Sequence, residues 1–574
     1  MKKLKLNLLT LGVASIILIS CGGLNKMVEN SKTVKYEVQP SPLETNGGEV
    51  AVTIKTKFPE KYFNKSAVVT ATPILKYEGG QTEFEPTILQ GEKVKANNKV
   101  IAYAGGDYTF TGKIPYKPEM LKSELVVDMS ARIKDKTPVE IKGIKIADGV
   151  IATSTLVKID PKAVLVGDKF QRVTPDSYNA EVLYLINQAD LRNTELKKDD
   201  VKKFNDNMAA ASKAGDKVAI KGAKISSYAS PDGPMTLNEK LSNKRGGTAE
   251  KYLLSELKKL KVQGYDVQGF LNTVVTAEDW DGFKKLMEAS SIQDKELVLR
   301  VLSMYSDPAV RNKEIKNISE AFGEIKTKVL PQLRRSQMSV NIDNIGYSDD
   351  QIKALAQSKP DTLKLEEILY AAALTTDLSD KARIYEAASK KFPNEFRPKN
   401  NLGYVYLQMG KTADAKAAFE AAKAIENNDV VKNNLGAIAL MDGDAVAAEG
   451  LFTSAMGAGD VVNYNLGIIK IKQGDYPAAV NYFGNKPSFD AALAQLLNKD
   501  ADKALSTLGE LGESKDAMVY YLKAVTGARS GKEDIVLNNL RRAVELDASL
   551  KAYAKKDAEF LKYSANEGFT AIVQ

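Results

Sequence analysis

The chain has 574 residues, of which 44% are hydrophobic and 27% are charged, and its formal net charge is +8. These are globular values, so wholesale disorder is excluded, and the length predicts about three to four domains. The charge is mild and spread along the chain, which argues against nucleic acid as a partner. Histidine is absent and Cys21 is the one cysteine. Histidine-based catalysis, most zinc sites, thiolate metal clusters and disulfides within the chain are therefore excluded.

Residues 1–20 have the pattern of an export signal: a basic start, an apolar run too short to span a bilayer comfortably, and small residues. The sequence LISCG at residues 18–22 resembles the lipobox of bacterial lipoproteins. In that family the signal is cut before the cysteine, which then carries acyl chains such as palmitate. The resemblance implies a lipidated Cys21 at the head of a linker, residues 21–32. The alternative is a plain secretory signal with a chance cysteine.

Several acyl chains on one residue would anchor the protein stably to the outer membrane. No other segment has the apolar length of a transmembrane helix. The residues after Cys21, GGLNK, lack the acidic cluster that resembles a surface-export tag in Bacteroidetes-type lipoproteins. We therefore expect the periplasmic face of the outer membrane.

Residues 33–165 show period-two alternation interrupted by Gly, Pro and Asn turns. Val50, Val52 and Ile54 alternate with polar neighbours, for example. Short strands separated by turn signals over this length predict an all-β sandwich. No residue in it indicates a binding site, so we expect a spacer or docking module.

Residues 170–345 mix strand and helix patterns. Alternating apolar residues in NAEVLYLI and KVAIKGAKI indicate strands, and LPQLRRSQMSVNI at 330–342 indicates a closing strand. A Pro-Gly turn at 231–234 precedes an amphipathic helix from Leu237 to about Leu260. The order predicts an α/β sandwich with helices on one face of a mixed sheet.

Residues 362–560 are rich in Ala, Leu and Lys and contain internal repeats. The tripeptide Asn-Leu-Gly begins at Asn401, Asn434 and Asn465, so the spacings are 33 and 31 residues. In each copy a glycine follows the leucine by eight positions, and a phenylalanine follows that glycine by nine. The pattern resembles tetratricopeptide repeats, which have a period of about 34 residues, and is strongest over 397–485. We expect an all-α solenoid that binds a protein partner.

Asn401, Asn434 and Asn465 recur at one point of successive first helices. They could line the concave surface and hold the backbone of a ligand. Equally, they could bond neighbouring turns within the stack. The sequence does not separate these two roles.

The stretch SYASPDGPMTLNEKLSNKRGGTAEKYL, residues 227–253, resembles the OmpA-like peptidoglycan-binding domain. The family pattern is a strand ending in G-H-T-D-x-x-G and then N-x-x-L-S-x-x-R-A on the next helix. The matching residues are Gly233, Asn238, Leu241, Ser242 and Arg245. The arginine pair Arg334-Arg335 resembles the pair before the family's last strand, and residues 278–328 resemble a helical insertion common in Bacteroidetes-type members.

In that family the turn aspartate and the helix arginine grip the charged groups of diaminopimelate in peptidoglycan. The resemblance implies a peptidoglycan site at Ser230, Asp232, Asn238 and Arg245. The aspartate position itself aligns with Ser230, which cannot balance an ammonium, so Asp232 would have to replace it. The other interpretation is that Arg245 only ties the helix to the sheet, in a fold kept for protein contacts.

These observations predict a non-enzymatic envelope lipoprotein, without cofactor or metal, that tethers or scaffolds. One alternative is a surface-exposed lipoprotein of an adhesin, fimbrial or secretion assembly. A second is a carboxylate-based glycan hydrolase, which needs an acid and a base about 5–10 Å apart across a cleft. The carboxylates Glu278, Asp279, Asp281 and Glu320 have no spacing that indicates such a pair.

Overall fold

The computed structural model describes residues 22–574, which form two compact units. Unit 1 combines the N-terminal region up to Val166 with residues 392–574, and unit 2 consists of residues 167–391. The predicted signal peptide and Cys21 lie outside the described residues. Within residues 22–574, no helix has both the length and the hydropathy that crossing a bilayer requires.

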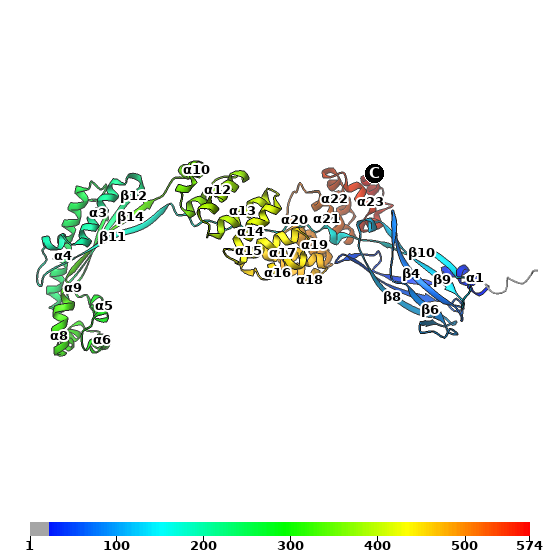
Figure 1. Cartoon of the computed structure of the whole chain (residues 1–574), viewed down its shortest axis with the longest axis horizontal. Helices are drawn as coiled ribbons and strands as arrows, with labels where there is room; N and C mark the ends of the chain where they lie inside the picture. The colour runs from blue at the N-terminus through cyan, green and yellow to red at the C-terminus, as the bar shows by residue number, and fades with distance from the viewer. Residues whose placement is uncertain (1–21) are drawn as a thin grey trace, which may run out of the picture. The chain divides into compact units, whose positions relative to one another are not determined.

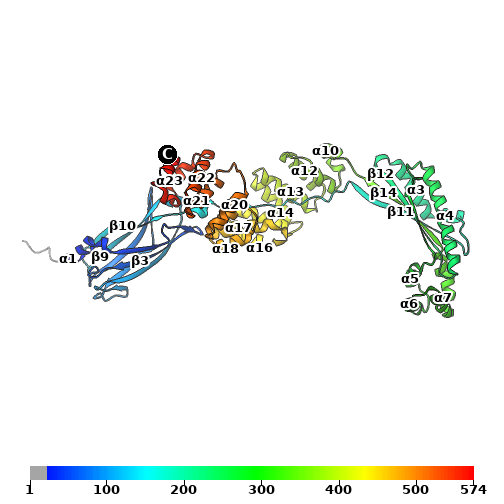
Figure 2. The same cartoon turned by 180° about the vertical axis from the view of Figure 1, so that it is seen from behind.

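The N-terminal part of unit 1 consists of two β-sheets (Figures 1 and 2). One sheet has the order β1-β3-β2 with β8 also paired to β3, and the other has the order β10-β9-β4-β6-β7 with β5 beside β4. The strands are β1 (Lys35–Gln39), β2 (Thr45–Asn46), β3 (Glu49–Phe58), β4 (Val68–Tyr77), β5 (Gly80–Glu83), β6 (Thr87–Gly91), β7 (Lys99–Ile101), β8 (Gly106–Pro115), β9 (Ser123–Arg132) and β10 (Val139–Gly149). Val50, Val52 and Ile54 of β3 are buried, so the period-two alternation marks the core-facing side of a strand, and the β-rich region is confirmed.

The C-terminal part of unit 1 is a stack of helix pairs, which confirms the predicted helical repeat region. Its main helices are α13 (Phe396–Gln408), α14 (Thr412–Lys423), α15 (Asp429–Met441), α16 (Ala445–Thr453), α17 (Asp460–Gln473), α18 (Tyr476–Phe483), α19 (Phe489–Leu497), α20 (Ala501–Glu510), α21 (Ala517–Arg529), α22 (Glu533–Leu546), α23 (Leu550–Lys556) and α24 (Glu567–Val573). The glycine of the Asn-Leu-Gly tripeptide is needed where the two helices of a pair touch. A Cβ added to Gly436 would lie 2.7 Å from the ring of Phe452, and the repeats before and after have the same close approach.

The β-sheets and the C-terminal helices of unit 1 are joined by partly buried polar contacts. Arg529 of α21 contacts Glu44 of the β-rich part at 2.8 Å and Glu559 at 2.6 Å. Thr153, in the segment after β10, donates a hydrogen bond to the same Glu559. Because these charge-assisted contacts link the two parts, the sheets and the solenoid pack as one body.

Unit 2 begins with a four-stranded sheet in the order β11-β14-β12-β13. Its strands are β11 (Val173–Leu183), β12 (Val218–Tyr228), β13 (Leu271–Thr276) and β14 (Arg335–Ile345), and all neighbours are antiparallel except β12 and β13. Apolar residues of α3 (Asp199–Lys213) and α4 (Met235–Lys259) share one core with the sheet. A mixed sheet covered by two helices is therefore observed.

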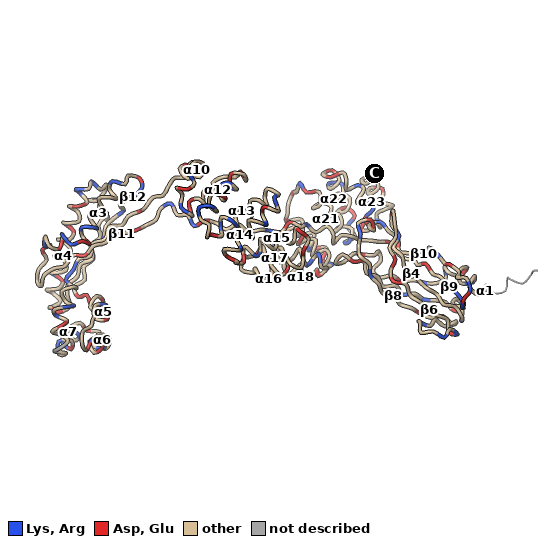
Figure 3. The backbone as a smooth tube through the Cα atoms, viewed as in Figure 1, with Lys and Arg blue, Asp and Glu red and all other residues tan. Residues whose placement is uncertain are grey.

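Two groups of short helices complete unit 2. Helices α5 (Trp280–Ala289), α6 (Lys295–Met304), α7 (Pro308–Asn317), α8 (Ser319–Glu324) and α9 (Leu330–Leu333) form a separate small core between β13 and β14. Helices α10 (Asp349–Ser358), α11 (Leu365–Ala373) and α12 (Leu378–Lys391) follow β14. Basic and acidic residues are interspersed along the backbone of both units (Figure 3).

Candidate functional site

The three repeated asparagines lie on the first helices of successive pairs, α13, α15 and α17. Asn401, Asn434 and Asn465 are at most 1% exposed. A buried amide that makes no hydrogen bond costs about 1–3 kcal/mol. Each of the three must therefore have partners, and the partners identify what the surface holds.

The partner is an extended segment of the chain itself. Residues 157–166, which we call the strap, form neither helix nor strand and run along the first helices of the solenoid (Figures 1 and 2). Both main-chain groups of Val164 bind Asn434: the N–H donates to Oδ1 at 2.7 Å and the C=O accepts from Nδ2 at 2.8 Å. Val166 is bound in the same way by Asn401, and Lys162 by Asn465.

The bound residues 162, 164 and 166 alternate along the strap, as expected when a chain is extended. Their numbers fall as the repeats advance, so the strap runs antiparallel to the order of the repeats. We call the surface of α13, α15, α17 and α19 that contacts the strap the strap groove.

A second row of asparagines completes this network. Asn400 and Asn433 each directly precede an asparagine of the first row. Asn400 donates to the carbonyl of Val164, and Asn433 donates to the carbonyl of Lys162, so each contacts the strap residue that the next repeat binds. They also accept hydrogen bonds from Asn434 and Asn465, respectively, across adjacent repeats. The asparagines therefore do both things that the sequence left open: they hold a main chain, and they bond neighbouring helices.

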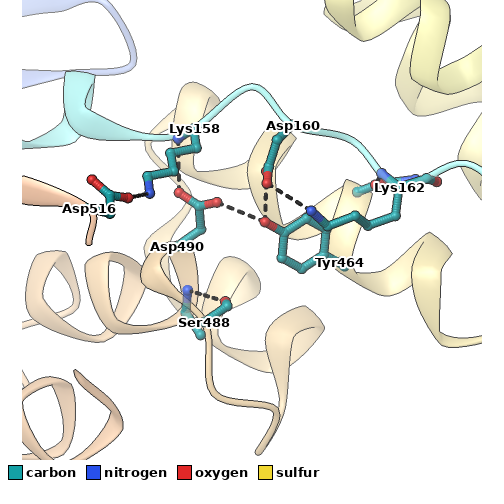
Figure 4. Close-up of polar contacts among 9 residues, drawn as sticks. Lys158, Asp160, Lys162, Tyr464, Ser488, Asp490 and Asp516 are labelled. Atoms are coloured by element: carbon teal, nitrogen blue, oxygen red, sulfur yellow. Dashed lines mark hydrogen bonds and ion pairs between the residues drawn. The ribbon is translucent and has the colours of Figure 1, made fainter. Parts of the chain in front are cut away.

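The N-terminal half of the strap is held by a different set of side chains (Figure 4). The position equivalent to Asn400 and Asn433 is occupied in the third repeat by Tyr464, whose hydroxyl contacts Asp160 at 2.8 Å and Asp490 at 3.1 Å. Asp490 of α19 accepts the N–H of Lys158 at 2.9 Å. The ammonium of Lys158 forms an ion pair with Asp516.

Burial shapes the electrostatics of this half. It raises the pKa of Asp490 to about 6, against the hydrogen bond from Lys158, and the nearby charge of Asp160 adds to the rise. Burial, with the two aspartates beside it, also raises the pKa of Tyr464. Tyr464 is therefore a neutral donor at physiological pH, and Asp490 ionises only near pH 6.

A cavity of about 560 Å³ lies beside this half of the strap. Its walls include Lys158, Asp160 and Lys162 of the strap and Tyr464 and Phe489 of the solenoid. The strap therefore does not fill the surface of the last repeats it crosses. The described residues contain no cluster of three or more His, Cys, Asp or Glu side chains placed to hold a metal ion.

Sequence reasoning named three of the groove residues and missed the rest. Asn400 and Asn433 could have been found, because each precedes the repeated tripeptide. Asp490 carries no such signal, since the next helix lacks the tripeptide. The occupant was missed because a short apolar run such as AVLV, residues 163–166, predicts a strand or a linker equally well.

In unit 2, the structure places Arg245 inside the fold. The side chain is 1% exposed, and it donates to the carbonyl oxygens of Gln188 at 3.0 Å, Tyr228 at 3.0 Å and Leu185 at 3.4 Å. Burial lowers its pKa to about 10. This geometry ties α4 to the end of β12 and to the loop after β11, and it leaves the guanidinium turned towards backbone carbonyls.

The other residues of the predicted peptidoglycan site lie near the same turn. Ser230 is buried and accepts a hydrogen bond from Arg334 at 3.1 Å, and Asp232 lies 3.5 Å from the same guanidinium. Asn238 donates to the carbonyl of Gly233 at 3.2 Å and so braces the turn. Asp232 also lines an open cavity of about 670 Å³ together with residues of α7.

Two of the carboxylates weighed for catalysis have local partners. Asp279 caps α5 by accepting the N–H of Gly282 at 2.8 Å, and it pairs with Arg335 at 2.6 Å. Glu278 accepts from the indole N–H of Trp280 at 3.0 Å. Both contacts stabilise the start of the inserted helices.

Comparison with known proteins identifies one of the repeats. Residues 397–429 match the family of the tetratricopeptide repeat. No curated protein sequence is significantly similar to the chain. Repeats of this class serve protein–protein interaction and scaffolding, so the solenoid has the fold of a protein-interaction module.

Three solved structures are among those similar to the chain. A tetratricopeptide repeat protein described as having an unusual peptide-binding site, YrrB, is 20% identical, with 30% of this chain and 99% of that chain covered and a TM-score of 0.26. A tetratricopeptide repeat protein from Parabacteroides merdae is 12% identical, with 38% and 91% covered and a TM-score of 0.29. The type IV pilus biogenesis factor PilW is 16% identical, with 39% and 98% covered and a TM-score of 0.26.

Replacing Asn434 by Ala should release the middle of the strap. The substitution leaves the N–H and C=O of Val164 with fewer partners in a partly buried place, so we expect a loss of about 1–3 kcal/mol in the free energy of unfolding. Hydrogen exchange should become faster at the amide of Val164. The matched control is Asn481→Ala, because that side chain is exposed. Unchanged exchange at Val164 would contradict the assignment.

Asp490→Asn should flatten the dependence of stability on pH. The folded pKa of about 6 lies above the ordinary value of 3.8, so the stabilisation from protonating Asp490 is complete below about pH 4 and is lost as the pH rises through 6. We expect a difference of about 3 kcal/mol between the two curves over this window, measured by urea unfolding. Asp557, whose pKa burial also raises to about 6, keeps part of the slope in both proteins. The exposed Asp442→Asn serves as control, and parallel curves for Asp490→Asn and the wild type would disprove the effect.

Proposed function

We propose that the protein is a non-enzymatic lipoprotein of the cell envelope that tethers and scaffolds. Its solenoid holds an extended peptide segment, and in the resting chain that segment is the strap. The observation that carries this proposal is the double row of buried asparagines bonded to the strap's main chain. An array of this kind binds a backbone in a fixed register, which is what a scaffold requires.

The membrane attachment in this proposal rests on the lipobox-like sequence before Cys21. The β-rich part of unit 1 follows the anchor and packs against the C-terminal helices through Arg529. Attachment at Cys21 would therefore fix the solenoid as well as the sheets close to the lipid. We place the protein on the periplasmic face of the outer membrane, with a surface assembly as the alternative.

For unit 2 we favour an OmpA-like module used for protein contacts. The resemblance in sequence is supported by a mixed sheet with two covering helices, and by Arg334 beside the turn. The position that would grip a peptidoglycan carboxylate is Arg245, and its donors are bonded to three backbone carbonyls. An arginine used in this way must break those bonds before it can bind a ligand.

Peptidoglycan binding is a second candidate function, favoured by one observation. Asp232 is partly exposed and lines the 670 Å³ cavity, so its carboxylate could meet the ammonium group of a peptide stem. In this version Asp232 replaces the acid that the family has at the position of Ser230.

The anchor is tested by replacing Cys21 with Ser in the full chain. We expect the wild type in the outer-membrane fraction and the variant in the soluble fraction, because the acyl chains supply the membrane affinity. Ser20→Ala is the matched control, since it keeps a small residue before the cysteine. If Cys21→Ser remains with the membranes after a high-salt wash, the lipoprotein assignment is wrong. Protease treatment of intact cells then separates the periplasmic from the surface location.

Co-sedimentation of the full chain with purified sacculi separates the two roles of unit 2. We expect no pelleting above the level without sacculi, because Arg245 is closed off. If the chain does pellet, and Asp232→Asn prevents it while the exposed Asp216→Asn does not, then the module binds peptidoglycan and the preference for protein contacts is overturned.

A further inference from the structure

The two halves of the strap are held in chemically different ways. At residues 162, 164 and 166 the asparagine rows bind main-chain groups, which every residue except proline offers. Leu165 is 36% exposed, so its side chain lies partly in solvent. This half therefore recognises an extended backbone and is tolerant of sequence.

In the N-terminal half, side chains are recognised. The ammonium of Lys158 lies 4.4 Å from the centre of the Phe489 ring and pairs with Asp516. A lysine between an aromatic face and a carboxylate is bound by cation–π attraction and by charge together. Replacing Lys158 with alanine would lose both the cation–π contact and the ion pair.

Two residues further on, Asp160 is recognised by a donor. Its carboxylate accepts from the hydroxyl of Tyr464 at 2.8 Å and from the ammonium of Lys162 at 2.8 Å. Lys162 in turn lies over the ring of Tyr464, 5.0 Å from its centre. A single tyrosine thus contacts both the acidic and the second basic residue of the strap (Figure 4).

The residues between these three positions are apolar and have no charged group for the groove to recognise. Ile159 is 39% exposed, although it is apolar, and Pro161 has no N–H to donate. Lys158, Asp160 and Lys162, which make the side-chain contacts, therefore alternate with the apolar residues Ile159 and Pro161, as the period of an extended chain requires.

We propose that the strap groove is a receptor selective for extended segments of the pattern Lys-x-Asp-x-Lys, followed by a short stretch read only through its backbone. The strap is the resident ligand, and a partner protein with the same pattern is accepted when the strap is out. This inference rests on the peptide-holding role of the solenoid proposed above, and it adds the chemical class of the ligand.

The cavity of about 560 Å³ supports an exchange of ligands at this end. It borders Lys158, Asp160 and Lys162, the three residues that are recognised through side chains. A competing segment can therefore reach the selective positions beside the strap before the asparagine rows are vacated. The strap keeps an advantage, because a tethered ligand acts at an effective concentration of about millimolar.

The test uses the full-length chain with residues 158–166 replaced by a Gly-Ser sequence of equal length. The probe is a fluorescein-labelled synthetic peptide with the sequence of residues 156–167, followed by fluorescence anisotropy. We expect saturable binding to the replaced chain and binding at least about tenfold weaker to the wild type, whose strap competes. The added peptide should also raise the melting temperature of the replaced chain.

Selectivity is measured with four variant peptides. Lys158→Ala and Asp160→Ala should each weaken binding about tenfold, since each removes a charge-assisted contact. Ile159→Ala and Leu165→Ala are the matched controls and should bind like the parent peptide. Equal affinity for all five peptides would overturn the proposed pattern while leaving the backbone-holding role intact.

Two further outcomes separate this inference from the function on which it rests. If a folded replaced chain binds none of the peptides, both the ligand class and the receptor role of the solenoid fail. If Asn434→Ala in the replaced chain leaves the affinity of the parent peptide unchanged, the peptide binds elsewhere and the inference fails. Should the replaced chain not fold, the double variant Lys158→Ala, Asp160→Ala in the full chain takes its place, because it retains the asparagine-bound half of the strap.

Discussion

The hydrogen bonds between buried asparagines and the strap are the interaction on which unit 1 depends. An amide side chain carries two donors and an acceptor, and burying it without partners destabilises the fold. The two N–H donors of Asn434 bind the carbonyl of Val164 and the side-chain oxygen of Asn400 in the preceding repeat. Its side-chain oxygen accepts from the N–H of Val164 and from Asn433 of its own repeat. The strap therefore completes the polar interior of the solenoid, and its removal would expose a row of amides to water.

The solenoid could be predicted from sequence to a useful depth, because its physics is local and periodic. Each repeat has a glycine equivalent to Gly436 and a phenylalanine equivalent to Phe452 at the same spacing, because the ring leaves no space for a Cβ. This spacing can be read from the sequence alone. The asparagines could be placed on one surface for the same reason. Their ligand could not be predicted, because even Val166 and Asn401, which are bonded to each other, are 235 residues apart, and the strap has no regular structure of its own.

Unit 2 illustrates a different limit. The sequence positions of Arg245 and Asp232 agree with a family pattern, and the sheet and helices expected around them are present. A pattern specifies which residue occupies a position, but the direction of its donors depends on the surrounding backbone. Here the carbonyls of Gln188, Tyr228 and Leu185 surround the guanidinium, and none of these contacts can be inferred from the motif.

The order of the segments along the chain determines when unit 1 can be completed. The strap is synthesised before unit 2, whereas the helices that hold it come after, and Lys158 and Asp490 are 332 residues apart. Contacts between such distant segments form late and slow the folding of a chain. Unit 2 can fold on its own contacts while the strap waits as an unpaired extended segment. The asparagines therefore meet their partner only after the helices that carry them have been synthesised, and the strap is by then available as a template along which successive repeats can pack.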